Sequence, residues 1–315
     1  MIKFKNRLFS FAGVPAIIIF LLSLIASGTT NDTTYEIPYD SDSSETSIPS
    51  EDYFYLQEDD ELLPMNKAVD LLEPQLLVDN EYVKITALNI DYSTYSGPSL
   101  ILEIENKTDE YITVQSSECQ VNGITIMPIM SDTVKDNNTA VIEMTFEDKH
   151  LSIAGIEEFV TIESRFVILD TASFDRINET EVGMCKTDSD YIQVYNDSGK
   201  VIHDDNNMKV VFHGIDYSDK NIGPDIILYV ENHNDYSVIM DIWDLTINGV
   251  LVDTAFSSEI SSESRMYMTC SYYFVSPAAL GIDKAEDVQF DLDFWSFESD
   301  FWIDVGEIIF EVEDH

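Results

Sequence analysis

The chain has 315 residues and 44% of them are hydrophobic, so it is long enough and apolar enough to bury a sizeable core. Its formal net charge is −44, from 60 acidic and 16 basic side chains. A surface this negative repels the phosphates of nucleic acids, which proteins bind through lysine and arginine. The composition therefore favours a globular protein with no nucleic-acid partner.

Residues 1–28 have the pattern of an export signal. Lys3, Lys5 and Arg7 precede an apolar run over residues 14–26, and small residues follow that run. The run is short for a membrane span, so the pattern predicts a signal peptide that is cleaved, with an uncleaved N-terminal membrane anchor as the alternative. In both cases we expect the rest of the chain outside the cytoplasm, secreted or at the cell surface. Contact with a membrane is expected only through this segment, if it stays uncleaved.

Residues 29–74 are predicted to form an acidic, flexible linker. From residue 31 to residue 61 the segment has many Asp and Glu side chains, several Ser and Thr, and no Lys or Arg. Charge repulsion and the scarcity of aliphatic side chains leave too little apolar burial to offset the entropy lost on ordering. We expect this segment to hold the folded part away from the membrane or wall.

The remainder of the chain contains an internal duplication. The stretch GPSLILEIENKTDEYITVQSSECQVNG, which begins at Gly97, aligns with GPDIILYVENHNDYSVIMDIWDLTING, which begins at Gly223. The offset is 126 residues throughout, and nine of the 27 aligned residues are identical. Each copy is long enough to bury its own core, unlike a solenoid repeat. The duplication predicts two tandem domains, residues 75–187 and 200–315, joined by an interdomain linker at residues 188–199.

Each copy reads as all-β. Leu100, Leu102 and Ile104 alternate with other residues, which is the period of a strand with one face in a core. Both copies place Asn-Gly between two apolar stretches, at Asn122 and at Asn248, and this dipeptide favours the tight turn of a β-hairpin. Several short strands in about 110 residues are typical of an immunoglobulin-like β-sandwich. The predicted fold is two such sandwiches in tandem.

These residues also carry a resemblance to a known family. The shared string GP.L.L.IEN.TD..I.V......VNG, followed by a Gly-Ile turn and an alternating strand, resembles the tandem immunoglobulin-like repeat domains of exported Firmicutes proteins. The resemblance covers roughly residues 75–187 and 200–315. It implies an exported protein built from β-sandwich domains, and it implies no particular activity, because these families are largely of unknown function.

No motif of an enzyme is present in the sequence. The five histidines are scattered, none lies in HExxH, and no serine lies in GxSxG. Acidic residues are so abundant that any two of them could be taken for a catalytic pair. We therefore expect a protein that is not an enzyme.

Four aspartates are candidate calcium ligands. Asp91 and Asp216 occupy equivalent places in the two copies of IDYS, and Asp204 and Asp205 lie together in HDDNN. Carboxylate oxygens are the ligands that calcium prefers. The alternative, which the sequence favours, is that these side chains bond their own backbone in turns at strand ends. No cofactor is expected, with calcium as the possible exception.

The stretch FWSFESDFW supplies the candidate ligand-binding residues, Trp295 and Trp302. On an alternating strand Phe294 faces the core, so Trp295 points the other way, where it could dock a sugar ring or a protein partner. The alternative, which the sequence favours, is that these aromatics are buried on the second face of a wide sandwich or between the two domains.

Taken together, the sequence predicts an exported, non-catalytic binding protein of the cell envelope or the secreted fraction, made of two duplicated β-sandwich domains. Its expected partner is an extracellular protein or glycan of unknown identity. The alternative is a calcium-stabilised structural spacer on the cell surface, in which the duplication sets the reach of the molecule.

Overall fold

The computed structural model describes residues 54–56, 68–71, 73–270 and 275–312. The chain divides into two compact units, Met1–Ser50 and Glu51–His315, and every described residue belongs to the second. The predicted signal segment and most of the predicted acidic linker lie outside the described residues.

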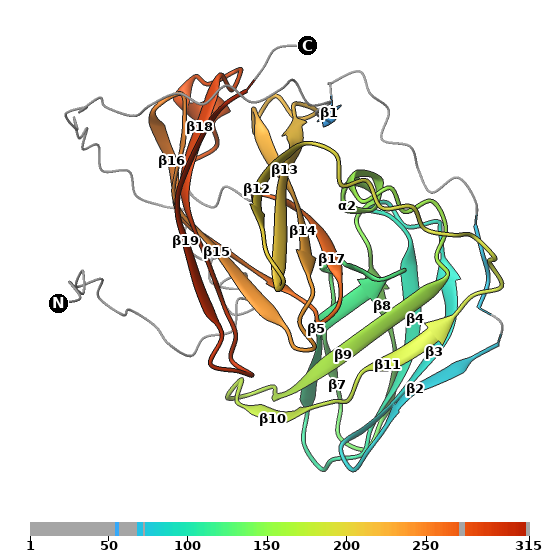
Figure 1. The fold of residues 1–315 in the computed structure, drawn as a ribbon. Helices are drawn as coiled ribbons and strands as arrows, with labels where there is room; N and C mark the ends of the chain where they lie inside the picture. Colours follow the sequence, from blue (N-terminus) through green and yellow to red (C-terminus); the bar gives the residue numbers. More distant parts are fainter. Residues whose placement is uncertain (1–53, 57–67, 72, 271–274, 313–315) are drawn as a thin grey trace. The chain divides into compact units, whose positions relative to one another are not determined.

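The fold is an all-β sandwich, as the sequence predicts (Figure 1). Among the described residues the exceptions are one short helix, α2 (Asp148–Ile153), and one turn of 3₁₀-helix, η1 (Ala278–Leu280). The 3₁₀ turn ends at Gly281, whose φ of 78° lies in the left-handed region that favours glycine.

The first half of the described chain is a sandwich of two antiparallel layers. One layer is a four-stranded sheet with the order β2-β3-β4-β8, and the strands of the other layer pair around β5 and β9. Leu102 of the first layer and Phe166 of the second are completely buried in one hydrophobic core. The strands are β2 (Gln75–Asp79), β3 (Val83–Asp91), β4 (Ser99–Asn106), β5 (Ile112–Val121), β6 (Ile124–Thr125), β7 (Ser131–Val134), β8 (Thr139–Thr145), β9 (Thr161–Asp170), β10 (Arg176–Glu179) and β11 (Gly183–Lys186).

The second half repeats this plan. Its four-stranded sheet has the order β16-β15-β18-β19, and its other layer contains β12, β13, β14 and β17, with the short β1 parallel to β13. Leu228 and Phe290, one from each layer, are buried in a second core. The strands are β1 (Phe54–Leu56), β12 (Lys200–Asp204), β13 (Met208–Asp216), β14 (Asp225–Asn232), β15 (Val238–Ile247), β16 (Val250–Ile260), β17 (Arg265–Thr269), β18 (Asp287–Trp295) and β19 (Trp302–Glu311).

The two Asn-Gly pairs form the predicted hairpin turns. Asn122 and Gly123 have φ values of 52° and 77°, and they connect β5 to β6. Asn248 and Gly249 have φ values of 54° and 69°, and they connect β15 to β16. Positive φ at both central residues is what a two-residue hairpin of the favoured twist requires.

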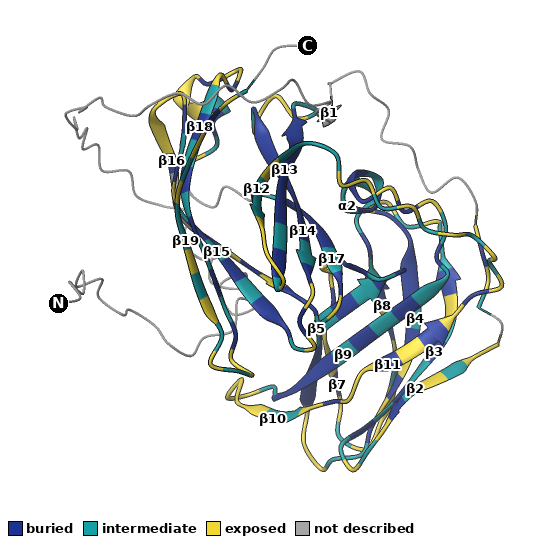
Figure 2. Ribbon diagram, viewed as in Figure 1, coloured by how far each residue is buried: buried dark blue, intermediate teal, exposed yellow. Residues whose placement is uncertain are grey.

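The two halves meet along one sheet. Strand β17 of the second half pairs with β6 of the first through Arg265 and Ile124, so that the two inner layers form an 11-stranded sheet. Strand β14 is buried on both faces (Figure 2). Ile226 and Leu228 point into the core of the second half, whereas Ile227 and Tyr229 join the hydrophobic core of the first. The halves therefore share an apolar contact as well as a backbone pairing.

The segment between β11 and β12, which contains the predicted linker at residues 188–199, is bonded to both halves. The Tyr195 hydroxyl donates to the carbonyl of Asn122 in the first half at 3.0 Å. In the second half, the Tyr267 hydroxyl both accepts from the Asn196 N–H at 2.8 Å and donates to the Asn196 carbonyl at 2.9 Å. The Arg265 guanidinium lies 4.1 Å from the centre of the Tyr195 ring. This segment is thus part of the folded body.

An asparagine that recurs in the two copies fastens a loop in each half. The Asn232 amide is buried and donates to the carbonyls of Tyr236, Ile260 and Ser261 at 2.9, 3.2 and 3.0 Å. Asn106 makes the corresponding three bonds in the first half. The EN dipeptide therefore recurs in the two copies because its asparagine makes the same three hydrogen bonds in each half.

We expect Asn232→Ala to lower the free energy of unfolding by about 3 kcal/mol, because three buried carbonyls lose their donor and each unsatisfied group costs about 1–3 kcal/mol. The exposed Asn89→Ala is the control and is expected to change stability by about 0.5 kcal/mol or less. Urea denaturation of both variants measures the difference. Equal midpoints for the two variants would contradict this role of Asn232.

Candidate functional site

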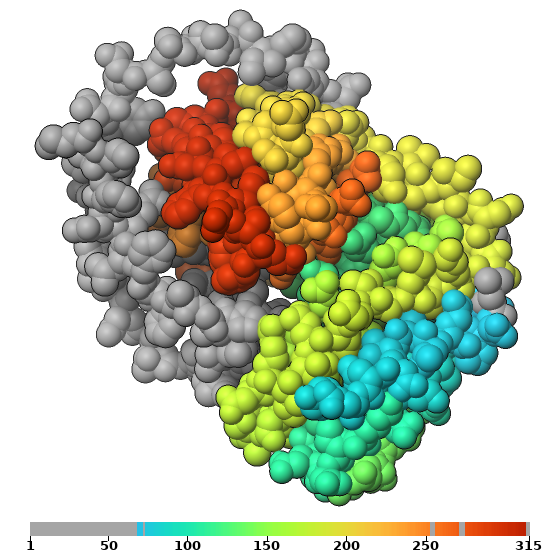
Figure 3. All heavy atoms as spheres, turned by 60° about the horizontal axis from the view of Figure 1, so that its bottom comes forward, coloured from blue at the N-terminus to red at the C-terminus, as the bar shows by residue number. Residues whose placement is uncertain are grey.

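The outer face of the sheet β16-β15-β18-β19 carries all three tryptophans of the chain, Trp243, Trp295 and Trp302. Side chains alternate along β18, so that Phe294 is completely buried and Trp295 turns away from the core, as predicted. Figure 2 shows the mixed exposure of β18 and β19, and in the view of Figure 3 atoms of these last strands lie at the surface.

Strand register brings the two candidate residues together. Trp295 lies directly opposite Trp302 on the neighbouring strand and opposite Ile239 on the other side. The ring of Phe297 packs edge-on against Trp295, with 4.4 Å between centroids. Trp302 is 66% exposed and Phe297 is 75% exposed. We call Trp295, Phe297 and Trp302 the aromatic cluster.

A hydrogen bond fixes the half-buried member of this cluster. The indole N–H of Trp295 donates to Oδ2 of Asp241 on β15 at 2.6 Å. A charged acceptor strengthens such a bond and leaves the ring little freedom to rotate. Trp295 is therefore held in place before any ligand arrives, which lowers the entropy that this side chain loses on binding.

A cleft lies beside the aromatic cluster where the two halves meet. Its volume is about 210 Å³. The first half contributes Glu118, Glu163 and Arg165, and the second contributes Asp235 and Glu298, among other residues. We call this the junction cleft. The residues that line it are Glu118, Cys119, Gln120, Glu163, Arg165, Val182, Asp235, Tyr236, Ser237, Ser261, Ser262 and Glu298.

The junction cleft is strongly acidic. Among the described residues that line it, four carry carboxylates and one, Arg165, carries a positive charge. Glu118 bonds the Ser237 hydroxyl across the two halves and lies 3.6 Å from Nε of Arg165. Glu259 lies nearby and is exposed as a residue, but the protein packed around its carboxyl removes water from it and raises its pKa to about 7. The charges of Glu118, Glu179 and Glu298 add to the rise. Negative charge at this junction is therefore only partly neutralised.

The aromatic cluster and the junction cleft form one continuous surface. Phe297 of the cluster is followed directly by Glu298 of the cleft. The hydroxyl of Ser296 donates to the carbonyl of Ser237 at 2.7 Å, so that the β18–β19 turn is tied to the cleft wall. The ring of Phe301 packs against Tyr236 at 5.8 Å between centroids. An extended ligand can therefore contact both parts at once.

The recurrent aspartates Asp91 and Asp216 bond their own turns. Oδ1 of Asp91 accepts the N–H and the hydroxyl of Ser93 at 2.8 and 2.7 Å, and these bonds lower the pKa of Asp91. Oδ1 of Asp216 accepts the N–H of Ser218 at 2.7 Å. The geometry is the strand-end turn that the sequence favours over a metal site.

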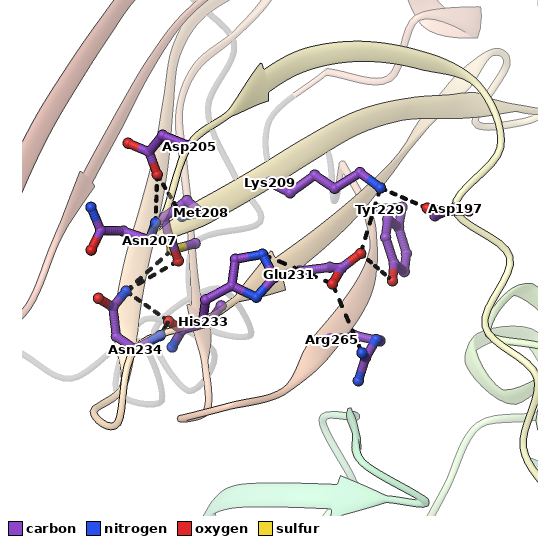
Figure 4. A network of polar contacts seen from close by, with 11 residues as sticks. Asp197, Asp205, Asn207, Met208, Lys209, Tyr229, Glu231, His233, Asn234 and Arg265 are labelled. Carbon is purple, nitrogen blue, oxygen red and sulfur yellow. Dashed lines mark hydrogen bonds and ion pairs between the residues drawn. The ribbon is translucent and has the colours of Figure 1, made fainter.

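Asp204 and Asp205 lie in a turn at the other end of β13 from Asp216. Asp205 accepts the N–H groups of Asn207 and Met208 at 2.7 and 2.8 Å (Figure 4). Its second oxygen is 3.3 Å from Nε2 of His203. The structure does not gather the four candidate aspartates in one place. In the part of the chain that the structure describes, no three acidic, histidine or cysteine side chains are arranged to hold a metal ion.

A charged network surrounds Glu231 on β14, also shown in Figure 4. Its carboxylate accepts the Tyr229 hydroxyl at 2.9 Å and lies 3.7 Å from Nζ of Lys209 and 3.9 Å from Arg265. Lys209 in turn contacts Asp197 at 2.6 Å. These charges balance one another and bind the segment at Asp197 to the second half, so the network is structural.

A buried ionic contact between the halves was missed by sequence reasoning. Nζ of Lys149, on α2 of the first half, lies 2.7 Å from Asp216 and 3.3 Å from Asp225 of the second half. The duplication contains a signal of this contact. Lys149 of the first copy aligns with Val275 of the second, and Asp225 of the second copy aligns with Ser99 of the first. A charge that is present in one copy and absent from the other is a difference that a contact between the copies can explain.

No helix among the described residues is long and apolar enough to cross a membrane. No description of a protein family matches the chain, and no curated protein matches it. Solved structures give weak similarities. The chain is similar to the YadV chaperone, with 12% identity, 68% of this chain and 92% of that chain covered, and a TM-score of 0.21. It is similar to a red sea bream transglutaminase (12% identity, 78% and 32% covered, TM-score 0.20) and to a 1.5-MDa bacterial ice-binding adhesin (14%, 62% and 51%, TM-score 0.17).

Proposed function

We propose that this chain is an exported, non-catalytic binding protein and that its partner docks on the aromatic cluster and the junction cleft. The observation that carries the proposal is the pair of large aromatic side chains, Trp302 and Phe297, that stay mostly exposed beside a third aromatic held by a hydrogen bond. Export rests on the pattern of residues 1–28, which lie outside the described residues.

The physical reasoning is that exposed tryptophan and phenylalanine cost free energy in water and are enriched where partners bind. Here they lie at one end of a sheet whose other face is packed on a core, so the surface is rigid. A rigid scaffold with an exposed aromatic group suits recognition of an extracellular protein or glycan. Membership in the immunoglobulin-like repeat family of exported proteins remains part of the same proposal.

Trp302→Ala is expected to weaken binding of the partner at least about tenfold, because a central aromatic anchor contributes about 2 kcal/mol or more. Since all three tryptophans lie on one sheet face, and two of them belong to the aromatic cluster, intrinsic tryptophan emission reports on this face of the molecule. The measurement is a titration with a panel of soluble glycans and peptides. The control is Tyr95→Ala, a fully exposed aromatic of the first half, which should leave the affinity unchanged. A ligand that binds both variants equally, without changing the emission, would exclude this surface.

Calcium binding stays a prediction, and melting the chain with excess calcium and with a chelator checks it, because an ion specific to the folded state raises the melting temperature. Asp91, Asp205 and Asp216 already accept hydrogen bonds from their own turns. No observation in the described residues favours the calcium-stabilised spacer over the binding protein.

A further inference from the structure

We propose that the ligand of this surface is a cationic peptide, a segment rich in arginine or lysine on the partner. One side chain of that segment enters the junction cleft, and its neighbours lie over the aromatic cluster. The inference rests on the proposed function of the same surface and names the chemistry of the partner.

Charge is the first argument. The described lining of the cleft has four carboxylates against the single guanidinium of Arg165, and Arg165 already faces Glu118. The other three carboxylates, those of Glu163, Asp235 and Glu298, repel one another there, and this costs free energy unless a cation accompanies them. A guanidinium or ammonium group from outside would neutralise this charge, whereas an anionic ligand would increase the repulsion.

The second argument is a buried polar atom without a partner. Ser261 lines the cleft and is 2% exposed, and its hydroxyl makes no hydrogen bond with the described residues. A buried hydroxyl without a partner costs about 1–3 kcal/mol. Nε of Arg165, in the same lining, is a buried donor that also lacks a hydrogen-bond partner. A cationic peptide carries N–H donors for the Ser261 oxygen and carbonyl acceptors for Arg165 Nε, and both buried atoms must become accessible when it binds.

Size is the third argument. Pockets for whole small-molecule ligands measure about 300–1,000 Å³. The junction cleft, at about 210 Å³, is smaller and suits one long side chain. The rest of the ligand must then lie outside the cleft, and the aromatic cluster is the surface next to it.

The aromatic cluster favours the same ligand. Arginine stacks on aromatic faces and its apolar stem packs on them, which contributes about 0.5–1 kcal/mol at an exposed site. Asp241 and Asp304 carry carboxylates on the same sheet face. A surface that alternates aromatic rings and carboxylates matches a cation with an apolar stem better than it matches a neutral sugar.

The test is a titration of the full-length chain with hexa-arginine, followed by tryptophan emission and by calorimetry. A chain of net charge −44 attracts any polycation, so the decisive comparison is between two variants with the same loss of charge. Glu298→Gln, in the cleft, is expected to weaken binding roughly three- to fivefold. Glu103→Gln, exposed on the first half, should leave the affinity and the emission change as in the unaltered chain.

Two results would overturn the inference. One is that hexa-arginine leaves tryptophan emission unchanged, and the other is that Glu298→Gln and Glu103→Gln bind it equally. Hexa-glutamine, which has the same length and no charge, should not bind. If a glycan binds in a Trp302-dependent way and hexa-arginine does not, the proposed function stands and the cationic ligand is wrong. Unchanged melting curves for both variants would show that the comparison concerns binding alone.

Discussion

Replacing Lys149 with methionine is expected to lower the free energy of unfolding by about 3 kcal/mol at pH 8, which is the low end of the cost of breaking a buried ion pair. Methionine keeps the apolar stem and removes the charge. The carboxylates of Asp216 and Asp225 are 2% and 6% exposed, so the loss of Lys149 leaves two negative charges without water or a counter-ion. The low end applies because the Lys149 side chain itself is 28% exposed.

The loss should depend on pH, because Asp225 titrates near neutrality. Burial raises the pKa of Asp225 from 3.8 to about 7, against the opposing effect of Lys149 and with a further rise from Asp216. An acid with a raised pKa in the folded state binds a proton more tightly there than in the unfolded chain. Its contribution to stability is therefore present at low pH and is lost as the pH rises through about 7. Without Lys149, protonation at pH 5 should restore part of the deficit seen at pH 8.

Urea denaturation at pH 5 and pH 8 measures both effects. The duplication supplies the control, because the first copy has Ser99 where the second has Asp225. Asp225→Ser combined with Lys149→Met removes one charge of each sign, and we expect it to be more stable than Lys149→Met alone. A deficit of equal size at the two pH values would show that Asp225 does not titrate in this range.

Local patterns predicted much of each half. The alternation around Phe294 was enough to place Trp295 on the outer face, and the Asn-Gly pairs at Asn122 and Asn248 formed the expected hairpins. These features depend on neighbours within a few residues, which the sequence displays directly. The strand-end turns at Asp91 and Asp216 are of the same kind.

The contact between the halves was not predicted, because the features that the two copies share report only on the inside of each half. The relevant residues are those in which the copies differ. Glu103 on β4 is exposed, whereas its equivalent Tyr229 on β14 is 1% exposed and packed into the first half's core. The junction cleft has the same origin, since Glu118 and Ser237 are 119 residues apart in the chain. No local period reports a pairing at that separation.

Tyr229→Glu, which gives β14 the residue of the first copy, is expected to have the largest effect on stability. It replaces an aromatic ring in an apolar contact by a carboxylate beside Glu231, to which the Tyr229 hydroxyl now donates. Loss of a buried aromatic and burial of an unpaired charge together should cost about 4 kcal/mol or more. Calorimetry and urea denaturation measure the loss. Because each half has its own core, we expect the halves to separate before either unfolds, so that one transition becomes two.

The reciprocal variant Glu103→Tyr is the matched control. It exchanges the same two residue types in the opposite direction at the equivalent position of the first copy, where the outer face of β4 is exposed. We expect it to change stability by about 0.5 kcal/mol or less, as surface substitutions do. If the two variants are destabilised equally, Tyr229 contributes no more to stability than any residue of a strand does, and its contact with the first half is unimportant. If Tyr229→Glu alone is destabilised and its unfolding splits, the apolar face of β14 is what makes one body of two duplicated sandwiches.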